Sequence, residues 1–222
     1  MTWLDSLSLV KTMENANLAY LNGQDIPTAD KVEMAHWVAS RQGLKGSYRG
    51  MFAPTEQDLH EGIRLFTGES LTYASGRHCM GQEAARLLRL WEVEIPEVKE
   101  TYERAVYWMR NNQEYMHHGT YCCGRCTLAY WRHYSVGDFE HKEEFLVNGL
   151  RVMKSERDGK GKWRRFPFYY SIFTLLDLNL QPAIEELRYT RGAMECYLEA
   201  SRRGSYAEKR RAILEKALAK VN

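Results

Sequence analysis

The chain has 222 residues and a formal net charge of +2 at pH 7, and aromatic residues make up 12% of it. So small a charge gives no electrostatic reason to expect nucleic-acid binding. A mean hydropathy of −0.55, with no apolar run near the roughly 18 residues of a membrane span, predicts no membrane span. The β-branched runs that mark strands are also missing. We therefore expect a soluble all-α protein.

The N-terminal segment MTWLDSLSLVKTMENANLAY has neither a basic region nor a compact apolar core, so we expect no secretion signal. Residues 1–29 are expected to form an N-terminal helix and a linker. The chain has five cysteines, and an odd number fits a reducing compartment better than a disulfide framework. The predicted localisation is therefore cytoplasmic.

One pattern recurs along residues 30–206: an apolar-led helix, a long polar residue, and then glycine, any residue and an aromatic. Three segments carry it: WVASRQGLKGSY (37–48), WMRNNQEYMHHGTY (108–121) and VMKSERDGKGKW (152–163), with a weaker copy in YLEASRRGSY (197–206). The positions Trp108, Val152 and Cys196 are 44 residues apart, close to the length of a two-helix solenoid unit. Residues 49–92 break this period, so they are expected to hold an extra helix or a degenerate unit.

The segments on either side of each glycine turn read as helices of two kinds. Apolar residues at helical spacing predict amphipathic outer helices, with stripes at Val98, Tyr102, Ala105 and Met109 and at Leu146, Leu150 and Met153. The inner helices are expected at 77–91, 122–134 and 165–178. The last is apolar almost all round, which indicates burial, and Pro167 suits its first turn. Residues 207–222 are expected to form a capping helix.

These units together predict a single all-α domain of α/α hairpins over residues 1–222. The pattern Gln-x3-Gly-x-aromatic resembles the QW repeat of triterpene cyclases, which belong to the α/α-toroid group with the β-subunits of protein prenyltransferases. The matching positions are Gln42/Gly46/Tyr48, a longer-looped Gln113/Gly119/Tyr121, and Arg157/Gly161/Trp163, where Arg replaces Gln. The resemblance implies a partial (α/α) toroid or curved helical array, left open or completed by a partner or a second copy. An ordinary helical bundle or a HEAT-like solenoid is the alternative.

The resemblance also directs the search for chemistry. The cyclases use an Asp-x-Asp-Asp acid motif, and DFEHKEE (138–144) is only a charged turn, so cyclase activity is not expected. The prenyltransferases hold zinc with Asp, Cys and His, and the local candidates here lie in HHGTYCCGRC. If residues 122–126 are helical, Cys122 and Cys126 share one face, and His118 could join them. The alternative is that these cysteines are simply small buried residues.

Cations recur where the inner helices begin, and aromatic rings follow them. Arginines near helix N-termini could bind an anionic head group, and the rings could then surround an apolar body. The candidate ligand-binding residues are Arg77, His78, Arg125, Trp131, Arg132, His133, Trp163, Arg164, Tyr169 and Tyr170. The alternative for each is structural: the arginines pair with surface acids and the rings pack.

Two functions stay open from the sequence. One is a concave cavity that binds an anionic or isoprenoid-like small molecule, with or without catalysis. The other is a protein-interaction module whose curved surface grips a protein segment. Elsewhere, TEQDLHEGIRL (55–65) predicts a capping box at Thr55 and Asp58, with Asp58, His60 and Glu61 exposed.

Overall fold

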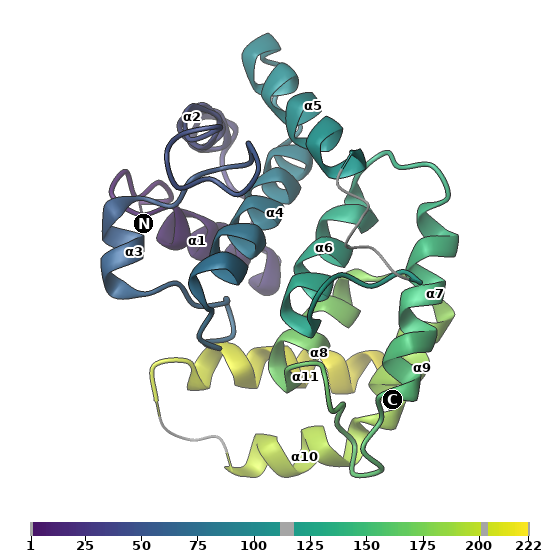
Figure 1. Cartoon of the computed structure of the whole chain (residues 1–222). Helices are drawn as coiled ribbons and strands as arrows, with labels where there is room; N and C mark the ends of the chain where they lie inside the picture. Colours follow the sequence, from purple (N-terminus) through teal and green to yellow (C-terminus); the bar gives the residue numbers. More distant parts are fainter. Residues whose placement is uncertain (1, 112–117, 201–203, 222) are drawn as a thin grey trace. The chain divides into compact units, whose positions relative to one another are not determined.

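The computed structural model describes residues 2–111, 118–200 and 204–221. Over these ranges the chain forms eleven helices and no strand (Figure 1). The all-α prediction is confirmed. None of the described helices is both long enough and apolar enough to cross a lipid bilayer.

The chain divides into two compact units. Unit 1 comprises Met1–Phe66 and Ser70–Tyr115, and unit 2 comprises Thr67–Glu69 and Met116–Asn222. Each unit is described by itself below. The single domain expected over 1–222, and the toroid arrangement of its hairpins, stay predictions.

Unit 1 is organised around one long buried helix, α4. Its described helices are α1 (Leu9–Asn22), α2 (Thr28–Ser40), α3 (Glu56–Glu61), α4 (Tyr73–Trp91) and α5 (Pro96–Arg110). Helix α4 contacts α1, α2 and α5, and Cys79, Ala84 and Leu87 on it have no exposed surface. The expected helix at 77–91 and the expected outer helix over 98–109 are both present. The extra helix expected within 49–92 is α3.

The short helix α3 is anchored by Asp58. The predicted capping box is present: Asp58 N donates to Thr55 Oγ1, and Thr55 N donates to the Asp58 carboxylate. The expected exposure of Asp58 was wrong, since the residue is only 3% exposed. Its carboxylate also accepts hydrogen bonds from Ser8 Oγ and from the Leu9 backbone N–H. Asp58 therefore caps the start of α1 as well as α3.

Unit 2 contains the most apolar helix of the described chain, α8. The helices of this unit are α6 (Gly124–Val136), α7 (Lys142–Ser155), α8 (Phe168–Asp177), α9 (Gln181–Tyr189), α10 (Arg191–Ala200) and α11 (Ala207–Val221). Helix α8 contacts α6, α9 and α11, and its residues 170–175 are buried. The burial predicted for 165–178 is confirmed for residues 170–175, whereas Arg165 is exposed and residues 167–169 are half-buried. Pro167 is the N-cap of α8 rather than a residue of its first turn.

The long polar residues of two glycine turns bond to the next outer helix. Gln42 Nε2 donates to the Thr101 carbonyl on α5 at 2.8 Å. Arg157 donates to Glu186 on α9 through two guanidinium nitrogens, at 2.8 and 3.1 Å. Gln113 of the second turn, and part of the weaker copy at 197–206, lie outside the described residues.

Glu186 is the centre of a buried network in unit 2. It is 1% exposed, and besides Arg157 it accepts a hydrogen bond from Trp163 Nε1 at 2.8 Å. The Arg157 guanidinium also lies 4.2 Å from the centre of the Tyr189 ring. One carboxylate therefore holds both ends of the 157–163 turn on α9.

Replacing Glu186 by Gln should destabilise the chain strongly. The substitution removes the charge that pairs with Arg157 and costs about 3 kcal/mol of unfolding free energy, because a partly buried guanidinium loses its partner. Urea denaturation followed by circular dichroism measures this loss. The neighbouring Glu185→Gln is the matched control, because Glu185 is 46% exposed and lies 3.8 Å from Lys154, so it should change stability by less than about 0.5 kcal/mol. Equal effects for the two variants would contradict the role given to Glu186.

Candidate functional site: a cysteine cluster at the start of helix α6

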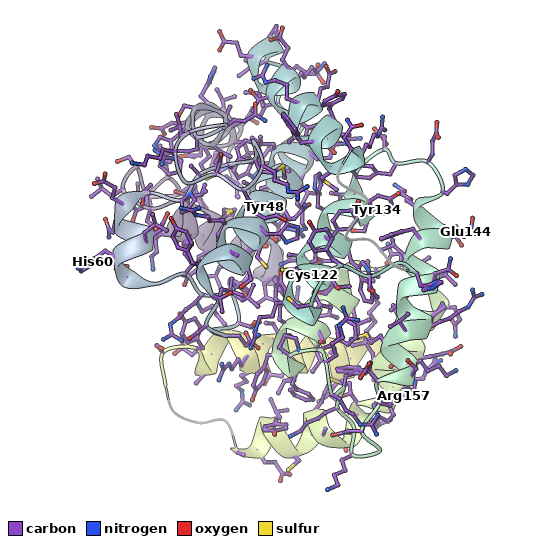
Figure 2. The ribbon with its side chains drawn as sticks, in the orientation of Figure 1. Tyr48, His60, Cys122, Tyr134, Glu144 and Arg157 are labelled. Atoms are coloured by element: carbon purple, nitrogen blue, oxygen red, sulfur yellow. The ribbon has the colours of Figure 1, made fainter. Side chains whose placement is uncertain are left out.

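Three cysteines of unit 2 gather where α6 begins. The sulfur atoms of Cys122, Cys123 and Cys126 all lie within 4.8 Å of one another. Figure 2 labels Cys122, which directly precedes the N-cap of the helix. Cys122 is exposed, Cys123 half-buried and Cys126 buried. The exposure of the three cysteines therefore decreases from Cys122 to Cys126.

Local hydrogen bonds explain why the helix begins at this point. Cys123 is the N-cap, with extended backbone, and its sulfur accepts a hydrogen bond from the Cys126 backbone N–H at 3.4 Å. Thr127 Oγ1 donates to the Cys123 carbonyl at 2.7 Å and accepts from Tyr121 N at 2.9 Å. A cysteine sulfur thus takes the place that a Ser or Asp oxygen usually takes at a helix N-cap.

Gly124 allows a second segment to approach the cluster. A Cβ atom built on Gly124 would lie 2.2 Å from the carbonyl oxygen of Arg165 and 3.1 Å from Cα of Phe166. No side chain fits into that space, so only glycine lets the turn at 164–166 rest on the first turn of α6. Arg165 Nη2 donates to the Tyr121 carbonyl at 2.6 Å and ties the same two segments together.

The environment of Cys123 favours its thiolate form. A hydrogen bond from the Cys126 thiol, with the backbone N–H groups of Cys126 and Arg125, outweighs partial burial and lowers the pKa of Cys123 to about 5. Helix N-termini and Cys-x2-Cys pairs both stabilise thiolates in this way. Burial, followed by the negative charge of Cys123, raises the pKa of Cys122. These interactions therefore favour the anion at Cys123 over the anion at Cys122.

The expected metal ligands are only partly brought together. Cys122 and Cys126 do lie close, but α6 begins at Gly124, so they do not share a helical face as expected. His118 is exposed, with a left-handed backbone (φ 49°), and it does not belong to the group of three sulfur donors. The neighbouring His117 lies outside the described residues.

Two of the predicted ligand-binding arginines belong to the segments that meet at the start of α6. Arg125 is within the first turn of α6, and Arg164 begins the turn that rests on Gly124. Both side chains are exposed, and within the described ranges neither guanidinium makes a hydrogen bond or ion pair.

The other candidates in unit 2 pack inside it. Trp131 Nε1 donates to the Gly119 carbonyl at 2.7 Å, and Trp163 Nε1 to Glu186. Arg132 is 1% exposed, bonds to Asp177 at 2.8 Å and lies 3.9 Å from the Phe173 ring centre. Two further candidates, His133 and Tyr170, are also buried.

Tyr169, on α8, is in a less enclosed position. It is half-buried, and its ring lies 4.5 Å from the Arg210 guanidinium and 5.9 Å from the Tyr197 ring. The ligand-binding role expected of these aromatic residues stays a prediction.

The two candidates in unit 1 have different environments. The Arg77 guanidinium lies 3.6 Å from the centre of the Tyr73 ring, a cation–π contact. His78 is 3% exposed, and burial lowers its pKa to about 3. At physiological pH His78 is therefore neutral and adds no positive charge for an anionic ligand.

Cys123 is not among the residues predicted from the sequence, although its Cys-x2-Cys spacing with Cys126 can be read there. A search of family models, of curated proteins and of solved structures found no match for this chain. The site is therefore interpreted from its own geometry.

Alkylation by iodoacetamide should reveal the Cys123 thiolate. In a Cys122→Ser background, Cys123 should react at pH 6 about tenfold faster than N-acetylcysteine amide, because its thiolate is already formed while its lower basicity reduces each thiolate's reactivity. Its rate should level off above about pH 6, because the thiolate is then fully formed. The rate of an ordinary thiol, which titrates near pH 8.5, should keep rising over the same range. Mass spectrometry of the tryptic peptide 111–125 measures the rate, and peptide 192–202 reports the exposed Cys196 in the same digest. A Cys123 rate that keeps rising through pH 8 would show that the thiolate is not stabilised.

Proposed function

We propose that this chain carries a redox-active dithiol, with Cys123 as the attacking sulfur and Cys126 as the resolving one, and that it takes part in thiol–disulfide exchange. The observation that carries this proposal is the placement of the two sulfurs within 4.8 Å at the first turn of α6, with Cys123 as the N-cap. The helix keeps them one turn apart, which suits the Cα separation of a disulfide.

The exchange follows from the different exposure of the two sulfurs. The Cys123 thiolate attacks a disulfide RS–SR, the S–S bond breaks, and one RS⁻ leaves as a mixed disulfide forms on Cys123. The buried Cys126 thiol then gives its proton to solvent and attacks the Cys123 sulfur, and the second RS⁻ departs. The chain has lost two electrons and gained a Cys123–Cys126 disulfide, while RS–SR has become two thiols. A second dithiol or a thiol pool must reduce the pair again before another cycle.

Zinc at the same sulfurs is a second candidate. Three sulfur donors within 4.8 Å supply three of the four ligands of a tetrahedral zinc ion and leave one position for an external group. The set contains neither the Asp nor the His that the prenyltransferase resemblance implies. Zinc bound to Cys122, Cys123 and Cys126 would act as a Lewis acid toward a fourth ligand.

The toroid arrangement is a separate proposal. It is supported by the bonds from Gln42 to α5 and from Arg157 to α9, because the repeats of a helical array contact their nearest neighbours. On this proposal, binding of an isoprenoid-like ligand or of a protein segment on a concave surface, and completion of the ring by a partner or a second copy, stay predictions.

Oxidation of the reduced chain should join two specific peptides. Trypsin cleaves after Arg125, so a Cys123–Cys126 disulfide links peptide 111–125 to peptide 126–132. With bis(2-hydroxyethyl) disulfide as oxidant, N-ethylmaleimide to trap free thiols and non-reducing mass spectrometry, we expect this linked pair in the wild type and in Cys122→Ser. In Cys123→Ser its formation should slow at least about tenfold, because the stabilised thiolate is gone.

Two results would overturn the redox proposal. One is a linked pair that forms as fast in Cys123→Ser as in the wild type. The other is stoichiometric zinc in the reduced chain, lost in Cys126→Ser, that keeps the three sulfurs from oxidising. The second result would establish the metal candidate instead. Cys196→Ser is the matched control and should leave the linked pair unchanged, because Cys196 is an exposed cysteine of α10 outside the cluster.

A further inference from the structure

We infer that the dithiol selects disulfides of small, carboxylate-bearing thiols, and that the exposed guanidinium groups of Arg125 and Arg164 make this selection. The inference rests on the proposed exchange at Cys123. It adds the substrate class, which neither sulfur by itself determines.

The geometry brings positive charge and thiols to one place. Gly124 packs against the Arg165 backbone, so residues 118–126 and 163–168 meet at the start of α6. These two segments contain Arg125, Arg164 and Arg165 and no Asp or Glu. Arg165 is bonded to the Tyr121 carbonyl, whereas the side chains of Arg125 and Arg164 extend into solvent. The two segments that meet at Cys123 therefore carry two exposed cations.

Guanidinium groups suit carboxylates especially well. Their planar donors can bind both oxygens of a carboxylate at once, and the N-terminus of α6 adds partial positive charge of the same sign. A cationic disulfide meets repulsion from all three sources. Positive charge near the reacting sulfur should therefore make anionic disulfides react faster than cationic ones. Salt should reduce this difference in rate.

The depth of the sulfurs favours a small substrate over a protein loop. Cys126 is buried and Cys123 is half-buried, so a disulfide has to reach a partly covered sulfur at Cys123. A low-molecular-mass disulfide can do so with little rearrangement. An acidic protein disulfide is the alternative that the experiment separates.

Three disulfides of matched size and different charge test the inference. These are 3,3′-dithiodipropionate (dianion), bis(2-hydroxyethyl) disulfide (neutral) and cystamine (dication), each allowed to oxidise the reduced Cys122→Ser/Cys196→Ser chain. Each rate is divided by the rate of the same disulfide with dithiothreitol. At low ionic strength the normalised rate should be about tenfold higher for the dianion than for the dication, with the neutral compound between them. About 0.5 M salt should compress this ratio to roughly twofold.

Matched charge-removing variants locate the effect. Arg125→Gln/Arg164→Gln should bring the dianion-to-dication ratio to about one. Arg188→Gln/Lys216→Gln removes the same charge from exposed positions on α9 and α11 and should keep the ratio near tenfold. Equal ratios in the two double variants would overturn the inference, since net charge alone would then explain the preference.

The outcomes also separate this inference from the function on which it rests. If the neutral disulfide fails to oxidise Cys123, thiol–disulfide exchange itself is wrong. If all three disulfides oxidise the pair at equal normalised rates, exchange stands and charge selection is wrong. If an acidic protein disulfide reacts much faster than 3,3′-dithiodipropionate, the choice of a small substrate is wrong.

Discussion

The candidate site depends on one contact that only glycine permits, between Gly124 and the backbone of Arg165. Because a Cβ at position 124 would lie 2.2 Å from the Arg165 carbonyl oxygen, a side chain there would push the 164–166 turn away from α6. With glycine, the turn rests on the helix start, and Arg165 holds the Tyr121 carbonyl. Thiols from one segment and cations from another thereby come to the same part of unit 2, although about forty residues separate them in the chain.

The three cysteines differ mainly in where they stand relative to the helix start. Cys122 precedes the N-cap and is exposed, Cys123 is the N-cap, and Cys126 is buried one turn further on. The N-cap position directs backbone N–H groups at the Cys123 sulfur and favours its anion. The start of α6 at Gly124 therefore determines which of the three cysteines is the N-cap.

The sequence predicted the helices well because their apolar stripes are local. Helices α5, α7 and α8 lie where the periodicity of Val98–Met109, Leu146–Met153 and 165–178 placed them. The sequence did not predict contacts between distant segments. The spacing of Thr55 and Asp58 predicted the cap of α3, but not the hydrogen bonds that Asp58 accepts from Ser8 and Leu9 at the start of α1. At the site, the helix was expected to include residue 122, and a boundary two residues further on turned Cys123 from a helical residue into the N-cap. Such boundaries depend on side-chain hydrogen bonds that periodicity does not record.

Urea denaturation of Gly124→Ala tests the central contact most directly. The methyl group collides with the backbone of the 164–166 turn, which can yield only by moving, so the variant should lose about 3 kcal/mol of unfolding free energy. Gly192→Ala is the matched comparison, since Gly192 lies in α10 and a Cβ there meets nothing within 4 Å. That variant should be neutral or slightly more stable, because alanine favours helix over glycine. If the unfolding free energy of Gly124→Ala lies within about 0.5 kcal/mol of the wild-type value, the contact between α6 and the 164–166 turn does not depend on glycine. That result would contradict the account.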